Sequence, residues 1–130
     1  MLIGEVAERS GVPARTIRFY EQRRILGIPS RSSGGYRVYS ERTLAELAFI
    51  KRAQQLGFSL EEIREVLSLG RGGRTACSRV STLCESHLRR IARQMVELQT
   101  FRRQLLQALR KAKAGCGSTR EGFCEAIMGS

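Results

Sequence analysis

Apolar residues recur at helical spacing along nearly the whole chain, and glycine and proline divide that pattern into segments. Residues 3–9 predict a short helix and residues 13–23 a second one, because proline is tolerated in the first turn of a helix. Gly11, Val12 and Pro13 separate the two. Two short helices joined by such a turn form a helix-turn-helix.

A segment rich in serine and glycine, residues 28–39, follows these helices. Its centre predicts a tight turn and its end, Tyr-Arg-Val-Tyr, has short β character, so a wing is expected. Two further helices are predicted over residues 40–56 and 59–69, the second of which begins with an S-x-x-E capping box. The glycine-rich residues 70–74 are expected to form a flexible joint.

One long helix is predicted from about Ala76 to Ala114. Two series of positions, each repeating every seven residues, form an apolar seam along it that only Arg102 interrupts. Since one helix cannot bury its own seam, the repeat predicts a coiled-coil dimer. The first series is Cys77, Cys84, Ile91, Leu98, Leu105 and Ala112, and the second is Leu88, Met95, Arg102 and Leu109.

Charge and composition narrow the class of partner. The chain carries 23 lysines and arginines against 12 acidic residues, a net charge of +11, and nucleic acid is the leading partner for so basic a chain. No apolar run is long enough to span a bilayer and no signal peptide is recognised, so a cytoplasmic protein without a membrane partner is expected. In that compartment the four cysteines indicate metal ligands, redox thiols or core residues.

Candidate DNA contacts occur in the second helix of the motif and in the wing. Short polar and basic side chains near the start of a recognition helix can reach base edges and phosphates. The wing alternates cations with phenols, which suits phosphate and sugar contacts, although the tyrosines could equally pack the wing against the helices. The candidates are Arg15, Thr16, Arg18 and Tyr20 in the helix and Arg31, Tyr36, Arg37 and Tyr39 in the wing.

Three motifs occur in order: IGEVAERSGVPARTIRFYE, RSSGGYRVY and QQLGFSLEEI. Together they resemble the MerR family of bacterial transcription regulators, and the long helix and terminal cysteines extend the resemblance towards its metal-responsive branch. The resemblance implies a mainly α protein with a winged helix-turn-helix DNA-binding domain (1–70), an antiparallel coiled-coil dimerisation helix (71–114) and a C-terminal metal-binding loop (115–130). It also implies a homodimer on a palindromic operator that, once induced, distorts promoter DNA so that RNA polymerase can engage it.

Cys116 and Cys124 can place two sulfurs on one ion, and thiolates favour soft or borderline metals. By the resemblance, sensors of divalent ions add a third ligand from the partner chain at the position of Cys77, where copper, silver and gold sensors have serine. Cys77 therefore favours Hg(II), Zn(II), Cd(II) or Pb(II), while the loop spacing resembles that of Cu(I) and Ag(I) sensors. Cys84 is expected to pack in the seam, and His87 to be a surface or seam residue.

Two departures from the family leave the local shape open. At Arg24 the family usually has glycine, so a differently shaped turn with Gly27 as its flexible point is expected. Before Cys116 the chain carries about one extra helical turn, or ~6 Å of rise. If the helix runs on, Cys116 overshoots the partner's Cys77, and if it breaks near residues 113–115 the loop can fold back.

The function expected is thus a dimeric, metal-responsive transcription regulator. Three alternatives stay open: a Cu(I) or Ag(I) sensor that uses only the two loop cysteines, a thiol redox regulator in which Cys116 and Cys124 form a disulfide, and a metal carrier whose basicity is incidental. An enzyme is not expected, because the chain has one histidine, no Ser/His/Asp set and no phosphate-binding loop.

Overall fold

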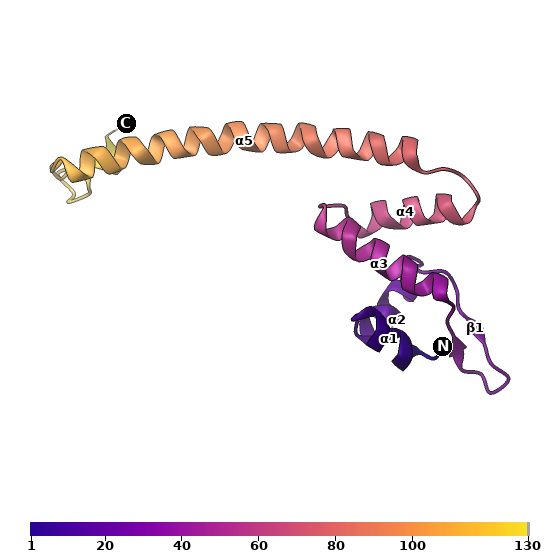
Figure 1. Ribbon diagram of the computed structural model, residues 1–130. Coiled ribbons are helices and arrows are strands. Elements are labelled where there is room, and N and C mark those ends of the chain that lie inside the picture. The colour runs from indigo at the N-terminus through magenta and orange to yellow at the C-terminus, as the bar shows by residue number, and fades with distance from the viewer. Residues whose placement is uncertain (130) are drawn as a thin grey trace. The chain divides into compact units, whose positions relative to one another are not determined.

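The computed structural model describes residues 1–129 and is mainly helical, as the sequence predicts (Figure 1). The chain forms two compact units, Met1–Leu83 and Cys84–Ser130, and the boundary between them falls inside the longest helix. In chain order the elements are α1 (Ile3–Ser10), α2 (Ala14–Gln22), β1 (Ser30–Arg31), β2 (Arg37–Val38), α3 (Glu41–Gln55), α4 (Leu60–Arg71), α5 (Cys77–Lys113) and α6 (Glu125–Met128).

The first unit is a helix-turn-helix with a wing, built around one hydrophobic core. α1 packs on α2 and on α3, and α4 packs on the other part of α3. The strands β1 and β2 pair antiparallel, with Ser30 opposite Val38 and Arg31 opposite Arg37, and so form the predicted wing. Six side chains are almost completely buried in the core: Val6, Ile17, Ile25, Leu47, Ile50 and Ile63.

The predicted capping box at the start of α4 is present. The Glu62 amide donates to Ser59 Oγ at 3.2 Å, and the Ser59 amide donates to Glu62 Oε1 at 2.8 Å. Two backbone donors that the helix itself cannot pair are thereby satisfied. The box orients the chain as it turns from α3 into α4.

Apart from α1, which ends at the left-handed Gly11, four helices end in the same backbone motif: one residue takes the left-handed conformation, and the next amide donates to the carbonyl five residues back. In three of them that residue is a glycine: Gly57 after α3 (φ 91°), Gly73 after α4 (φ 74°) and Gly115 after α5 (φ 82°). After α2 it is Arg24, at φ 59°. The Ile25 amide closes the motif by donating to the carbonyl of Tyr20 at 2.9 Å.

The expectation of a differently shaped turn after α2 is therefore wrong. Arg24 adopts the left-handed conformation that its side chain disfavours, because the backbone hydrogen bonds and the buried Ile25 that follows fix the turn. Gly27 is not among the residues with positive φ, and its amide instead donates to Glu46 Oε2 at 3.3 Å.

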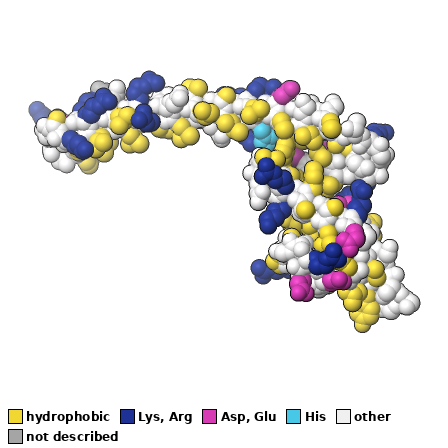
Figure 2. Space-filling view, viewed as in Figure 1, with side chains coloured by type: hydrophobic (Ala, Val, Ile, Leu, Met, Phe, Trp, Pro, Cys, Tyr) yellow, Lys and Arg dark blue, Asp and Glu magenta, His cyan; other side chains and the backbone are white. Residues whose placement is uncertain are grey.

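The seam of α5 is exposed within a single chain, as expected for a helix that needs a partner. Its large apolar side chains are between 44% and 70% exposed, and Figure 2 shows hydrophobic side chains along the helix together with many lysines and arginines. Within residues 1–129, no helix is both long and apolar enough to cross a membrane. The exposed seam residues are Leu88, Ile91, Met95, Leu98, Leu105 and Leu109.

Candidate nucleic-acid interface and candidate metal site

A groove of about 670 Å³ opens between the start of α1, the helix α2 and the wing. Arg18 from α2 lines it together with Arg31, Tyr36 and Arg37 from the wing. Three guanidinium groups around one concave surface can bind phosphate oxygens in bidentate fashion. The fold therefore brings together four of the eight residues predicted to contact DNA.

Glu21 fixes the wing to α2. Its carboxylate, only 10% exposed, pairs with Arg37 Nε at 3.0 Å and accepts a hydrogen bond from the Tyr39 hydroxyl. Burial and the hydrogen bond to Glu21 raise the pKa of Tyr39 to about 12. Glu21 is not among the residues predicted from the sequence, although a lone carboxylate in so basic a segment indicates that it pairs internally.

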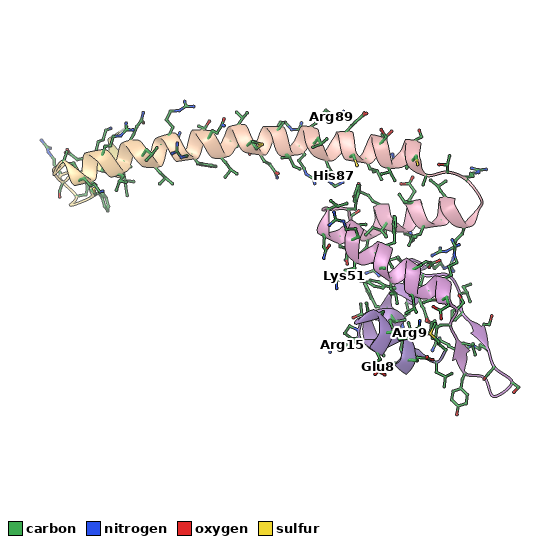
Figure 3. The ribbon with its side chains drawn as sticks, in the orientation of Figure 1. Glu8, Arg9, Arg15, Lys51, His87 and Arg89 are labelled. Atoms are coloured by element: carbon green, nitrogen blue, oxygen red, sulfur yellow. The ribbon has the colours of Figure 1, made fainter. Side chains whose placement is uncertain are left out.

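The other four predicted residues divide between the surface and the core. The Arg15 side chain projects outward from α2 (Figure 3), and Thr16 is half-buried in the first turn of that helix. Tyr20 and Tyr39 lie in the hydrophobic core, 8% and 4% exposed. Their hydroxyls meet Gln54 at 3.5 Å and Glu21, so both tyrosines pack the unit instead of facing a ligand.

The thiols of Cys116 and Cys124 lie 3.5 Å apart. A tight turn between them brings this about: the Thr119 amide donates to the Phe123 carbonyl at 2.8 Å, and Ser118 and Cys124 form an antiparallel bridge. Gly122, at φ 86°, supplies the left-handed residue that the turn requires. Seven intervening residues thus fold into a compact clip that holds two sulfurs together.

The long helix breaks before this clip, as one of the two alternatives from the sequence required. α5 ends at Lys113, and Gly115 reverses the chain. The following helix α6 folds back on α5: Ala126 is 5% exposed, and Lys111 Nζ donates to the carbonyl of Gly129 at 3.0 Å. The helix α6 is not predicted from the sequence, because its local signal is only the short apolar run after Cys124.

The helix α6 also acts on the adjacent thiol. The backbone amide of Ala126 donates to Cys124, and together with the Cys116 thiol it lowers the pKa of the Cys124 thiol. A lower pKa makes the thiolate, the form that binds metals, more available at neutral pH.

One chain supplies only these two sulfurs. Within its described residues, no cluster of three or more His, Cys, Asp or Glu side chains could hold a metal ion. Cys77 is the first residue of α5 and is exposed. Cys84 is half-buried, and the ring of His87 contacts Arg90 Nη2 at 2.8 Å.

Comparison with known proteins assigns the family. A model of the MerR HTH family regulatory proteins matches residues 1–69, and a MerR DNA-binding model matches residues 44–108. The chain is 42% identical over 102 residues to the uncharacterized HTH-type transcriptional regulator PA4778 of Pseudomonas aeruginosa, covering 78% of this chain and 77% of the relative. It is 36% identical over 105 residues to the heavy metal-dependent transcription regulator 2 of Rhizobium meliloti, covering 81% and 71%.

Solved structures agree over most of the chain. PbrR691 from Ralstonia metallidurans CH34, in complex with lead(II), matches with a TM-score of 0.79 and 31% identity over 99% of this chain and 98% of that one. MerR from Bacillus megaterium MB1, in complex with mercury(II), gives 0.65 and 32% over 99% and 98%. HiNmlR, bound to promoter DNA, gives 0.57 and 26% over 88% and 93%. The chain therefore belongs to the MerR family of helix-turn-helix regulatory proteins, which are transcriptional regulators and not enzymes.

Proposed function

We propose that this protein is a metal-responsive transcriptional regulator that works as a homodimer on promoter DNA. The observation that carries the proposal is the pair of thiols, Cys116 and Cys124, held 3.5 Å apart in a folded clip of a MerR-family chain. Two relatives were solved with lead(II) and mercury(II), and the name of a third describes it as heavy metal-dependent. The metal ion is then the signal, and the DNA-binding unit gives the response.

Residues 1–70 bind DNA in this proposal, residues 71–114 pair two chains, and residues 115–130 hold the metal. Exposure and the basic groove support phosphate contacts, whereas the buried Tyr20 and Tyr39 drop out of the set. Such a regulator works in the cytoplasm, where promoter DNA lies. The proposed DNA-contacting residues are Arg15, Thr16, Arg18, Arg31, Tyr36 and Arg37.

The dimer is proposed to act by deforming DNA. A coiled coil holds the two recognition helices at a fixed separation. The two helices can therefore bind both halves of a palindrome only when the DNA is deformed so that the half-site spacing matches this separation. Bending and untwisting an operator costs a few kcal/mol of free energy. The coupling free energy between metal binding and DNA binding can be of the same order. RNA polymerase then engages a promoter whose two elements have been brought into alignment.

The heptad pattern supports one register for the antiparallel pair. A two-fold axis between Val96 and Glu97 places each of the four residues of the second seam series opposite a residue of the first series. In this register α5 overlaps its partner over nearly its full length, and the partner's Cys77 falls opposite Cys116. The pairs across the axis are Cys84–Leu109, Ile91–Arg102, Met95–Leu98 and Leu88–Leu105.

Shifting the axis by half a heptad gives two rival registers. An axis at Thr100 brings the partner's Cys84 opposite Cys116 but leaves the first turns of α5 unpaired, and an axis at Arg93 brings no thiol there. Each turn removed from the paired seam loses buried apolar area, so the register with the longest overlap is favoured. Of the registers that bring a thiol opposite Cys116, the longest is the one with the axis between Val96 and Glu97, in which the partner's Cys77 is the third ligand. In that register Cys116 does not overshoot the partner's Cys77, although the chain carries an extra helical turn before Cys116.

A third thiolate from the partner's Cys77 favours a divalent ion. The two clip sulfurs, 3.5 Å apart, would need to open only to about 3.8 Å for tetrahedral Zn(II) with Zn–S bonds of about 2.3 Å. We therefore favour Zn(II), Cd(II), Pb(II) or three-coordinate Hg(II) over Cu(I) or Ag(I).

The same distance also favours a second function, a thiol redox switch. A disulfide needs the sulfurs about 2.05 Å apart, so a closure of about 1.5 Å would let them bond. Each thiol would lose one proton and one electron, and a peroxide that accepts two electrons would be reduced to water or an alcohol.

An anaerobic titration separates the two functions. The homodimer on its operator is titrated with Zn(II), Cd(II), Pb(II), Hg(II) or Cu(I), with base-analogue fluorescence reporting DNA distortion and X-ray absorption counting sulfurs. We expect one divalent ion per clip, three sulfurs around it and a distortion that tracks occupancy. A distortion produced by peroxide alone, with no stoichiometric metal, would reject the metal-responsive function.

A further inference from the structure

An ion pair with a buried carboxylate joins three parts of the first unit, Met1–Leu83. Glu46 of α3 is 6% exposed, and its carboxylate accepts hydrogen bonds from four donors. Arg42 Nε and Arg71 Nε donate to Oε1, both at 3.2 Å. Arg71 Nη2 and the Gly27 amide donate to Oε2 at 2.9 and 3.3 Å. Burial alone would raise the pKa of Glu46, but the hydrogen bonds, those from Arg71 foremost, lower it, so the carboxylate stays charged.

Arg71 reaches beyond this carboxylate. It is the last residue of α4, and its Nη2 also donates to the backbone carbonyl of Ile25. Ile25 follows the left-handed Arg24, and its amide closes the end of α2. One guanidinium group therefore holds together the end of α4, the middle of α3 and the exit of the recognition helix.

Such a pair is suited to fixing geometry. Burying the Glu46 charge beside a guanidinium that is 27% exposed costs free energy, and an apolar pair of the same size is often equally stable or more so. Apolar contacts are non-directional, whereas a guanidinium with two nitrogens on a carboxylate and one on a carbonyl accepts little rotation or sliding. The pair is thus a device for orientation, since stability alone would not require it.

Two glycines follow Arg71 before α5 begins. They are Gly72 and Gly73, the second at φ 74°, and α5 begins at Cys77. A change in α5 can reach α4 through this short segment or through the contact of Arg79 Nε with Glu65 Oε2 of α4, at 2.9 Å. Both of these routes enter α4.

We propose that the Glu46–Arg71 pair is a positioning clamp that makes the recognition helix α2 follow the end of α4. When α4 is displaced, the Arg71 guanidinium moves with it and carries the Ile25 carbonyl and the Glu46 carboxylate. The Gly27 amide, bound to that carboxylate, follows, and so does the end of α2. The inference rests on the proposed function, because it needs a metal-dependent change to transmit. Glu46 and Arg71 are positioning residues and touch neither metal nor the proposed DNA groove.

The test replaces the clamp by an apolar pair in the full-length homodimer. The double variant Glu46→Leu/Arg71→Met fills the same volume without the directional bonds, so the fold is retained. Glu61→Leu/Arg64→Met is the matched control, because it removes an exposed ion pair between two residues of α4 itself. Operator affinity without metal, Zn(II) affinity and the Zn(II)-induced fluorescence change of an operator carrying a base analogue are measured for each.

We expect the clamp variant to bind the operator and Zn(II) within about threefold of the unmodified protein. Its Zn(II)-induced fluorescence change should fall by about fivefold or more at saturation, while the control variant keeps its full response. An undiminished response in a folded clamp variant overturns the inference and leaves the proposed function standing. If the unmodified protein itself gives no metal response, the proposed function fails first, and the inference fails with it.

Discussion

Replacing Arg24 by glycine should stabilise the protein, which is unusual for a single substitution. Arg24 occupies the left-handed position of the motif that ends α2, at φ 59°, whereas the equivalent residue after α3, α4 and α5 is glycine. The left-handed conformation costs a residue with a Cβ about 1–2 kcal/mol. Glycine relieves that cost, but its greater freedom in the unfolded chain takes back about 0.5–1 kcal/mol.

At the midpoints of these ranges, the net gain expected for Arg24→Gly is therefore about 0.75 kcal/mol in the free energy of unfolding. For a unit of this size that corresponds to a rise in Tm of about 3–6 °C. The measurement is urea and thermal unfolding of the homodimer at a fixed protein concentration, since dimer stability depends on concentration.

Two controls isolate the backbone from the charge. Arg24→Ala removes the guanidinium but keeps the Cβ, so its stability should stay within about 0.5 kcal/mol of the unmodified protein. Gly57→Ala makes the reverse change at φ 91°, where a Cβ meets no heavy atom within 4 Å, and should destabilise by about 1 kcal/mol through strain alone. A glycine variant no more stable than the alanine variant would refute the argument from strain.

Three further outcomes are expected. Arg18→Ala should weaken operator binding about equally for related sequences and reduce the slope of log affinity against log salt by about one, as measured by titrations at several salt concentrations. Cys77→Ser should lower the sulfur count around a divalent ion from three to two while Cys84→Ser leaves it unchanged, and the opposite result would support the register with its axis at Thr100. Folding lowers the pKa of Glu46, so its carboxylate stabilises the folded protein fully at pH values above the ordinary glutamate pKa of about 4.3. This contribution is lost as the pH falls through the lower pKa of the folded state. Urea unfolding between about pH 3 and 7 should accordingly show a shallower acid decline for Glu46→Gln, and an identical decline would contradict the assignment.

The sequence by itself determined the features that depend on neighbours along the chain. The seam from Cys77 to Ala112 repeats every seven residues, and that period alone requires a long helix with a partner. Ser59 and Glu62 are three residues apart, so their capping box forms wherever that helix begins. The spacing of Cys116 and Cys124 is short enough for a local turn to join them, as it does.

Only the tertiary structure decided which side chains of these elements face the core. Tyr20 and Tyr36 are both phenols in the predicted DNA-reading segment, yet one is 8% and the other 69% exposed, because packing between elements distant in sequence covers the first. The Glu46–Arg71 pair spans 25 positions, and neither residue carries a local signal that predicts it. Arg24 shows the same principle in the backbone, since local preference opposes its left-handed conformation and the hydrogen bonds and burial around it prevail.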